Sequence, residues 1–361
     1  MPPIARKNHH MALHSKEKAT KWVLFLWKGQ IGYIVKILLK LLFAAAILFW
    51  LIHQGKLDFS LIGKAFQDPK WPMLTIFLVL TTNLFGAWRW KKLVEIKAGR
   101  NLPFVPILKL SWIGLFFSSV LPGAVTGDIL KIFYAKHLDP KLTKTFLIMS
   151  VLMDRIIGLI GLLFLLGGFS LYSYREVTAI SPSLAHLIHF NFLLFIGVFI
   201  FFLSIFLPKT IQAKILPWTL RVPFLGERIH KTLEQVWLMG QSHGTILLCL
   251  GMSLCSQFFN ILGFWSITAP FYQVPISFPH IFTFMPVGMM AVAVPISPAG
   301  LGVGHAIFDG LFKLYGTFNG ASLFNLYFII TVSINLMGVF PYLMFKAHPP
   351  VEEGEPDKSL V

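Results

Sequence analysis

The chain has 361 residues, of which 56% are hydrophobic and only 13% are charged, and its formal net charge is +16. Soluble domains carry about 25% charged residues, so this composition excludes an ordinary soluble fold. Because the Lys and Arg residues flank apolar runs, the positive-inside rule explains the charge better than nucleic-acid binding does. The composition therefore predicts an all-α, polytopic membrane protein with no nucleic-acid partner.

Eight segments are apolar over roughly the 20 residues that a helix needs to cross a bilayer core of about 30 Å. Two of them are broken by Pro and Gly residues, one between Ser118 and Asp128 and the other between Pro295 and His305. Non-helical backbone is tolerated at membrane depth only where protein or water satisfies its polar groups. We therefore expect about six full spans and two re-entrant hairpins. The eight segments are residues 34–52, 71–88, 103–121, 145–171, 187–207, 244–267, 279–297 and 321–345.

The distribution of Lys and Arg residues distinguishes two topologies. Eight precede or enter the first span, six lie in residues 89–109, five in 208–243 and four in 131–144. If all eight segments crossed the bilayer, residues 131–144 would lie opposite the other basic regions, against the positive-inside rule. A re-entrant hairpin over 103–137 returns them to the same side. A second hairpin over 279–318 then enters from the other side, and three full spans between the hairpins predict an inverted repeat.

The same pattern divides the chain into three parts. Residues 1–30 are expected to form a basic cytoplasmic arm, residues 31–346 a single transmembrane domain and residues 347–361 a disordered tail. Within the domain, residues 208–243 are expected to lie on the cytoplasmic surface as an amphipathic segment. Both termini would then be cytoplasmic.

Two consecutive charges, Asp154 and Arg155, lie inside the fourth apolar segment. They follow Lys144 at its basic edge by about ten residues, or roughly 15 Å of helix. Inserting a charge at such depth costs at least about 2.5–3.5 kcal/mol of free energy. Charged residues there are therefore first considered as functional residues. In one interpretation Arg155 holds a phosphate and Asp154 orients it. In the other, the two form a buried ion pair that another polar residue completes.

Three more charged residues are candidates for the same site. Asp128 opens a helix predicted over about 128–136, whose N-terminus favours an anion, although Asp128 could simply be its N-cap. Lys131 follows one turn later and either reaches the same cavity or snorkels to the interface. Arg89 ends the second span and either anchors it at the interface or binds an anionic lipid headgroup.

The remaining candidates are turn residues and amides. Glycine permits tight turns and close approach of a ligand, and the two broken segments supply Pro122, Gly123, Gly127, Pro298, Gly300 and Gly302. His305 either contacts a headgroup, gates or titrates, or is a satisfied polar residue in a tight turn. Four amides lie within spans and either join helices by hydrogen bonds or line the pathway: Asn83, Gln257, Asn260 and Asn335.

Other motifs are sparse. The sequence holds no G-x-x-x-x-G-K-[ST] nucleotide-binding loop and no H-E-x-x-H zinc motif, so we expect no cofactor and no bound metal. Cys249 and Cys255 lie in one span, six residues apart, which is not a helical neighbour spacing. They are expected to be two free, buried thiols.

At these motifs the chain resembles the flippase-like transmembrane domain of the lysylphosphatidylglycerol synthase family, over about residues 30–345. The matching stretches are Arg89-Trp90, Leu121-Pro122-Gly123 through Gly127-Asp128, Asp154-Arg155-Ile156-Ile157-Gly158 and Pro295-Ile296-Ser297-Pro298-Ala299-Gly300-Leu301-Gly302. Many members have Arg-Glu where this chain has Gly304-His305, and Gly-Gly-Asp where it has Thr126-Gly127-Asp128. The resemblance implies a multi-pass protein of a bacterial or archaeal cytoplasmic membrane. It also implies binding and translocation of an anionic, amino-acylated or polyprenyl-linked lipid.

Three hypotheses about function follow. The favoured one is a lipid flippase or transporter that is not an enzyme and whose partners are membrane lipids, with a homo-oligomer or a lipid-modifying enzyme left open as a further partner. The second is a membrane-embedded transferase acting on a polyprenyl phosphate or phospholipid, with Asp128 and Asp154 as acid and base. Such chemistry usually needs a metal, and the chain lacks a carboxylate-rich D-D-x-x-D cluster. The third is a non-transporting membrane scaffold.

Overall fold

The computed structural model describes residues 60–120, 126–221, 226–294 and 300–344, together with Phe49 and His53. These residues form α-helices joined by short turns, and no β-strand occurs among them. The predicted all-α polytopic membrane fold is therefore confirmed. The predicted first span lies outside the described residues except for Phe49 and, just beyond its end, His53. The arm over 1–30 and the tail over 347–361 also lie outside them.

Within the described part of the chain, five helical segments are long and apolar enough to cross a membrane. They are α3 (Lys70–Ala98), α6 (Lys144–Tyr172), α8 (Pro182–Ser204), α11 (His243–Thr268, extended by a 3₁₀ turn to Phe271) and α14 (Gly320–Leu336) with α15 (Val339–Met344). The last predicted span is thus divided by a turn at Met337 and Gly338. A side chain at Gly338 would overlap the backbone of Trp112, so this glycine permits close contact between the turn and α4 (Phe104–Val120).

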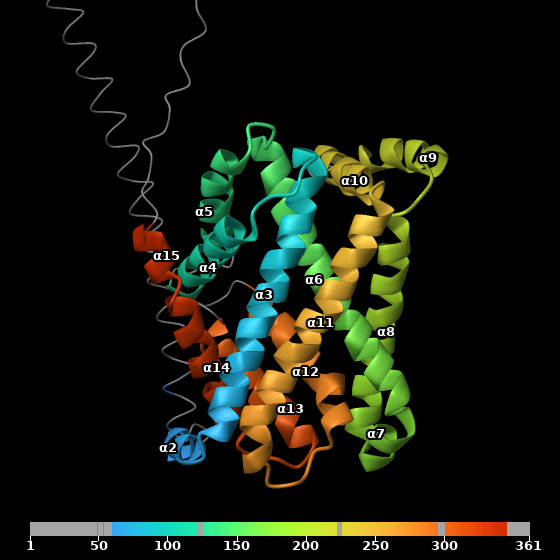
Figure 1. The fold of residues 1–361 in the computed structure, drawn as a ribbon. Coiled ribbons are helices and arrows are strands. Elements are labelled where there is room, and N and C mark those ends of the chain that lie inside the picture. Colours follow the sequence, from blue (N-terminus) through green and yellow to red (C-terminus); the bar gives the residue numbers. More distant parts are fainter. Residues whose placement is uncertain are drawn as a thin grey trace, which may run out of the picture.

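Four shorter helices form two helical hairpins. Helices α4 (Phe104–Val120) and α5 (Thr126–Ala135) pack together, as do α12 (Phe278–Ala293) and α13 (Val303–Leu314). With 17, 10, 16 and 12 residues, each helix is shorter than the roughly 20 residues of a full span. The first hairpin occupies the half of the molecule where α3 ends, and the second occupies the opposite half (Figure 1). The two predicted hairpins are therefore present and enter from opposite ends.

The packing partners of the two halves correspond. Helix α3 corresponds to α11, α6 to α14 and α4 to α12. The contact of α3 with α6 corresponds to that of α11 with α14, and the contact of α6 with α11 corresponds to that of α14 with α3. Likewise, α4 packs on α14 and α12 packs on α6. Helices α3 and α11 lie side by side and run in opposite directions (Figure 1). Two halves of opposite orientation that exchange partners in this way have the arrangement of an inverted repeat.

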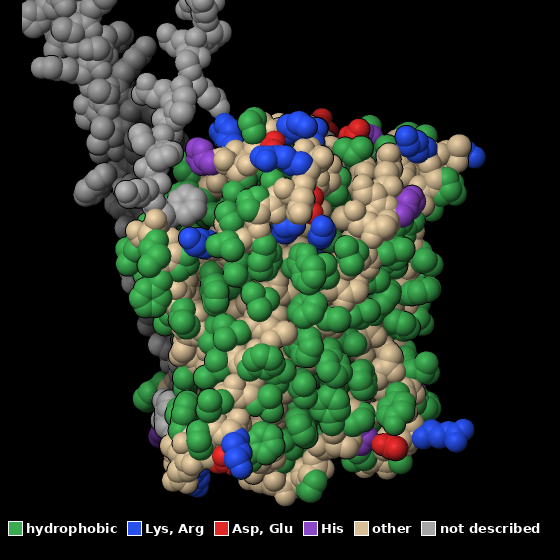
Figure 2. Space-filling view, viewed as in Figure 1, with side chains coloured by type: hydrophobic (Ala, Val, Ile, Leu, Met, Phe, Trp, Pro, Cys, Tyr) green, Lys and Arg blue, Asp and Glu red, His purple; other side chains and the backbone are tan. Residues whose placement is uncertain are grey.

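The short helices lie at the two ends of the bundle. At one end are α2 (Ser60–Gln67) and α7 (Tyr174–Ile180), and at the other are α9 (Lys209–Thr219) and α10 (Gly226–Gly240) (Figure 1). A belt of hydrophobic side chains separates the ends, and Lys and Arg side chains gather around α9, α10 and the end of α3 (Figure 2). We call this last region the basic end.

The loop between α5 and α6 also lies at the basic end. Arg100 Nε donates to Asp139 Oδ2 over 2.6 Å, and Lys141 Nζ donates to the carbonyl oxygen of Ala98 over 3.4 Å. The backbone N–H of Lys141 and the Arg100 guanidinium hold the pKa of Asp139 below its usual range. These bonds fasten residues 136–144 to the end of α3, which is the juxtaposition that the distribution of Lys and Arg residues predicts.

One prediction about the helix surfaces is wrong. Cys249 and Cys255 are both free, but only Cys249 is buried and Cys255 is exposed. Six residues on an α-helix correspond to about 600° of rotation, so the two side chains point toward different faces.

The topology can be tested by cysteine labelling in a variant without Cys249 and Cys255. Lys97→Cys, Lys144→Cys and Lys214→Cys should react with a membrane-impermeant maleimide from one side of the membrane, and Arg175→Cys from the other. The reason is that a re-entrant first hairpin returns Lys144 to the basic end. Reaction of Lys144→Cys from the same side as Arg175→Cys would contradict this topology.

Candidate functional site

Five charged side chains from α3, α5 and α6 lie together inside the membrane-spanning part of the molecule. They are Arg89, Asp128, Lys131, Asp154 and Arg155, and we call them the charge cluster. Asp154 lies ten residues after the first residue of α6, which is about 15 Å from the basic end. All five are candidate site residues in the sequence, and the fold brings all five to one place.

Arg89 forms the buried part of the charge cluster. Its Nε donates to Asp154 Oδ1 over 2.7 Å, and its Nη1 donates to Ser253 Oγ over 3.1 Å. A Cβ atom at Gly158 would lie 3.3 Å from Arg89 Nη2, so the guanidinium rests on bare helix backbone. Only 8% of Arg89 is exposed, and the residue joins α3, α6 and α11. It is therefore not an interfacial anchor at the membrane surface.

Arg155 forms a second ion pair, with Asp128. The distances from Asp128 Oδ2 to Arg155 Nε and Nη2 are 2.6 and 2.5 Å. Of the two interpretations made from sequence, the ion pair between Asp154 and Arg155 is not the one these distances show, because consecutive residues of a helix point about 100° apart and each residue pairs with another helix. Asp154 faces α3 and Arg155 faces α5. The Arg155 side chain is 46% exposed, so this pair is the accessible part of the charge cluster.

Lys131 completes the charge cluster without a close carboxylate among the described residues. Its Nζ lies 3.7 Å from the centroid of the Trp90 ring, a cation–π contact, and only 7% of the residue is exposed. The ammonium also interacts electrostatically with Asp154 and Asp128. Lys131 thus points into the molecule and does not snorkel to the interface. Three basic groups face two carboxylates, which leaves one excess positive charge among the described residues.

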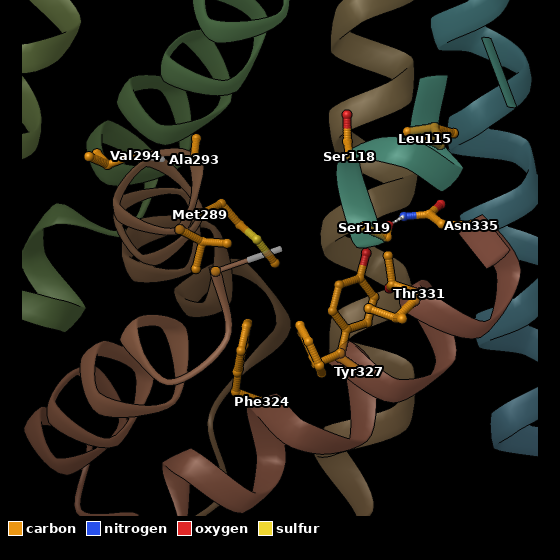
Figure 3. Close-up of a pocket in the computed structure, with 14 residues that line it drawn as sticks. Leu115, Ser118, Ser119, Met289, Ala293, Val294, Phe324, Tyr327, Thr331 and Asn335 are labelled. Carbon is orange, nitrogen blue, oxygen red and sulfur yellow. Dashed lines mark hydrogen bonds between the residues drawn. The ribbon is translucent and has the colours of Figure 1, made fainter. Parts of the chain in front are cut away.

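A cavity of about 230 Å³ lies where the two hairpins meet α14 (Figure 3). Its lining is mostly apolar and includes hydroxyl and amide groups. Asn335 Nδ2 donates to Ser119 Oγ over 3.2 Å, and the Tyr327 hydroxyl donates to Asn260 Oδ1. The lining residues are Leu115, Ser118 and Ser119 of α4, Met289, Val292 and Ala293 of α12, Val294, Gly300, and Phe324, Tyr327, Phe328, Thr331, Val332 and Asn335 of α14. The flanks of both predicted breaks therefore border one cavity.

The first hairpin connects this cavity to the charge cluster. A side chain at Gly127 would overlap the carbonyl of Gly114 and the hydroxyl of Ser118, so only glycine allows α5 to approach α4 this closely. Ser118 lines the cavity, and Asp128, next to Gly127, binds Arg155. The cavity and the charge cluster are therefore adjacent on one hairpin.

The second hairpin places its histidine in the core. Gly300 and Gly302 adopt φ values of 75° and 80°, which favour glycine. His305 Nδ1 accepts from the backbone N–H of Gly302 over 3.3 Å, so its proton lies on Nε2, which donates to Asn325 Oδ1 over 3.1 Å. His305 is fully buried and caps α13. Of the interpretations made from sequence, this geometry matches the satisfied polar residue.

The remaining candidates differ in where they lie and in what they bond to. Gln257 Nε2 donates to the carbonyl of Gly158 over 3.3 Å and joins α11 to α6. The Nδ2 atom of Asn83 is buried without a hydrogen-bond partner among the described residues. Asn260 and Asn335 form the interhelical bonds at the cavity described above. Pro122, Gly123 and Pro298 lie outside the described residues.

The sequence patterns do not predict how the neighbouring groups support the charge cluster. Ser253 accepts from Arg89 and donates to the carbonyl of Ile157 over 2.9 Å. Gly161 lies against Ser253, and Trp90 carries Lys131 on its ring. The sequence does carry one indication of this support, which is the spacing of Gly158 and Gly161. Each lies one helical turn after the preceding residue of the series that starts at Asp154. Glycines so spaced predict a helix face that another helix or side chain approaches closely.

The sequence profile described as lysylphosphatidylglycerol synthase TM region matches residues 37–338. The chain belongs to this family. It is therefore a multi-pass membrane protein of a family with a lipid-related function. A comparison with curated proteins gave no match.

The pairing of Arg89 with Asp154 predicts a specific pattern of stability. Asp154→Ala should lower the free energy of unfolding by about 3–5 kcal/mol, because it leaves the buried Arg89 charge unpaired. The double variant Arg89→Ala/Asp154→Ala should lose less. Denaturation in detergent measures both, with Glu227→Ala, an exposed carboxylate of α10, as control. If the double variant loses the sum of the single losses, the two residues are not coupled.

The glycines of α6 give a matched pair of variants. Gly161→Ala should lower the free energy of unfolding by about 1–3 kcal/mol, because the new methyl group would overlap Ser253. Gly168→Ala in the same helix should be neutral or stabilising, because no atom beyond the local helix backbone lies within 4 Å of the added Cβ. Equal melting temperatures for the two variants would contradict the described contact of α6 with α11.

Proposed function

We propose that the protein is a lipid flippase or transporter that holds the phosphate of a membrane lipid at the charge cluster and carries it across the bilayer. The observation that carries this proposal is the excess positive charge of the charge cluster at membrane depth, with Arg155 accessible at 46% exposure. A phosphate that crosses the apolar centre must be neutralised there, because an uncompensated charge at that depth costs at least about 2.5–3.5 kcal/mol.

The chemistry of the charge cluster suits a phosphate. Arginine presents a planar set of donors that binds phosphate in a bidentate manner, and Arg155 is the accessible arginine. The N-terminus of α5, where Asp128 lies, contributes the positive end of its helix dipole. An anionic headgroup that reaches Arg155 therefore meets both a guanidinium and a helix terminus.

The cavity supplies the second half of the site. Transporters with inverted repeats bind their substrates where the broken helices of the two repeats meet. The cavity lies at that junction, and its apolar lining with Ser118, Ser119 and Asn335 suits the part of a lipid between headgroup and chains. In this proposal the charge cluster holds the phosphate while the cavity receives the adjoining groups.

The two carboxylates support transport more than catalysis. Asp128 and Asp154 each hold an arginine in an ion pair, which positions the two guanidinium groups. A transferase would use the same carboxylates as acid and base, and they would have to leave these arginines to do so. We therefore assign them the task of orienting Arg155 and Arg89, and we propose that the protein is not an enzyme.

Transport by purified protein tests this function. In vesicles without ATP, the protein should speed movement of a fluorescent anionic phospholipid between leaflets, measured by dithionite quenching. Arg155→Ala should reduce the rate at least tenfold because the phosphate loses its accessible partner. Arg155→Lys should restore only part of it, because lysine lacks the planar donor set. Arg175→Ala, an exposed arginine at the opposite end, should keep the full rate.

Three results would contradict the proposal. A full rate in Arg155→Ala would remove the charge cluster from the transport path. Metal-dependent turnover of a lipid phosphate without transport would favour the transferase. The absence of both transport and turnover in a correctly folded protein would favour the scaffold.

A further inference from the structure

Helix α9 (Lys209–Thr219) presents an apolar stripe at the surface of the molecule. Its side chains Ile211, Ile215 and Trp218 are 42%, 37% and 68% exposed. At about 100° of rotation per residue, these three side chains fall within an arc of about 60° on the helix. None of the described residues of α9 is buried, so the stripe is not part of the packed core.

The other side of α9 is fastened to the rest of the basic end. Gln212 Nε2 donates to the carbonyl oxygen of Leu207 over 2.7 Å. His230 Nδ1 of α10 donates to the carbonyl oxygen of Leu216 over 3.1 Å, and α9 packs on α10. These contacts fix the rotation of α9 about its own axis, and they leave the apolar stripe on the outside.

The position of α9 indicates what the apolar stripe meets. Among the five candidate spans of the described chain, α8 has the smallest buried share, at 17%, so lipid chains surround most of it. Helix α9 follows α8 after a short turn and lies across the end of the bundle (Figure 1). The hydrophobic belt ends there and Lys and Arg side chains begin (Figure 2). This is the level of the lipid headgroups, where amphipathic helices and Trp side chains are enriched.

The charge of this segment suits anionic headgroups. Lys209, Lys214 and Arg221 are exposed, and no Asp or Glu occurs in residues 177–226. Within the described residues, none of the three forms an ion pair. The Arg221 guanidinium lies 5.0 Å from the centroid of the Trp218 ring, so a cation accompanies the apolar stripe.

A cavity of about 340 Å³ opens beside α9, between the ends of α8 and α10 and the start of α11. Its volume falls in the range of small-molecule sites, about 300–1,000 Å³. Lys209 lines it together with the polar side chains of Gln241 and His243, and its described lining contains no carboxylate. Trp237 fixes one wall, because its Nε1 donates to the last carbonyl oxygen of α8 over 2.8 Å.

We propose that α9 and this cavity form a second lipid site, which binds an anionic phospholipid of the leaflet at the basic end. Lys209 at the cavity and Lys214 beside the apolar stripe receive the negative headgroup, while Ile211, Ile215 and Trp218 enter the boundary of the acyl chains. A lipid held on this exposed surface exchanges with the surrounding leaflet. Binding here requires no transport, so the site stands whether or not the charge cluster carries a lipid.

The fluorescence of Trp218 tests this site in vesicles that contain the full-length protein. The vesicles consist of phosphatidylcholine in which a tenth of the lipid is either phosphatidylglycerol or phosphatidylcholine with brominated chains. The signal of Trp218 is the difference between the wild type and Trp218→Phe. Brominated phosphatidylglycerol should quench this signal roughly threefold or more above brominated phosphatidylcholine, because basic side chains concentrate anionic lipid around α9.

Charge variants test the part of the basic side chains. Lys209→Gln/Lys214→Gln should reduce quenching by the anionic lipid to the level of the zwitterionic one. Lys64→Gln/Lys70→Gln removes the same charge from exposed positions at the opposite end and should keep the preference. Arg221 stays in place in both variants, because it contacts the reporting ring. An unchanged preference in folded Lys209→Gln/Lys214→Gln would overturn the headgroup site.

Three further results would overturn the proposed occupant. Equal quenching by the two brominated lipids would mean that α9 does not prefer anionic lipid. No quenching by either lipid would mean that the apolar stripe faces water or a protein. Loss of the preference in inorganic phosphate, at an ionic strength where chloride preserves it, would mean that the cavity binds free phosphate in place of a headgroup.

Discussion

Compensation of charge at membrane depth is the constraint on which the arrangement of the central helices depends. Each uncompensated charge there costs at least about 2.5–3.5 kcal/mol, and the charge cluster contains five charged side chains. Two ion pairs and one aromatic ring lie against these charges. Because Arg89 also bonds to Ser253, the same contacts fix α3 against α6 and α11. The contacts that compensate the buried charges therefore also hold the helices of the bundle together.

The two similar halves differ at corresponding positions of their hairpins. The third residue of α5 is Asp128 and the third residue of α13 is His305, and each directly follows a glycine. Each bonds to the next membrane helix, Asp128 to Arg155 and His305 to Asn325. Corresponding positions thus carry an ion pair near the basic end and a neutral pair near the opposite end. Of these two positions, only the first offers a positive side chain to an anionic headgroup.

Much of the fold could be predicted from the sequence, because apolar runs, Pro/Gly breaks and Lys/Arg loops report depth in the membrane. They predicted the full spans that the structure describes, both hairpins and the location of residues 131–144. They did not predict which residues pair, because pairing depends on how each helix is rotated. Asp154 and Arg155 are adjacent in sequence and still face different helices. The turn at Gly338 and the support from Ser253 also depend on contacts with distant segments, which local patterns do not encode.

The lipids that remain bound to the purified protein would test the central claim most directly. Native mass spectrometry of the wild type, released from membranes of mixed composition, should show a bound lipid with a net negative headgroup. The same measurement on folded Arg155→Ala should show that lipid depleted, because its phosphate has lost the accessible guanidinium. Retention of zwitterionic or amino-acylated lipids in its place, or equal retention by both proteins, would contradict a phosphate site at the charge cluster.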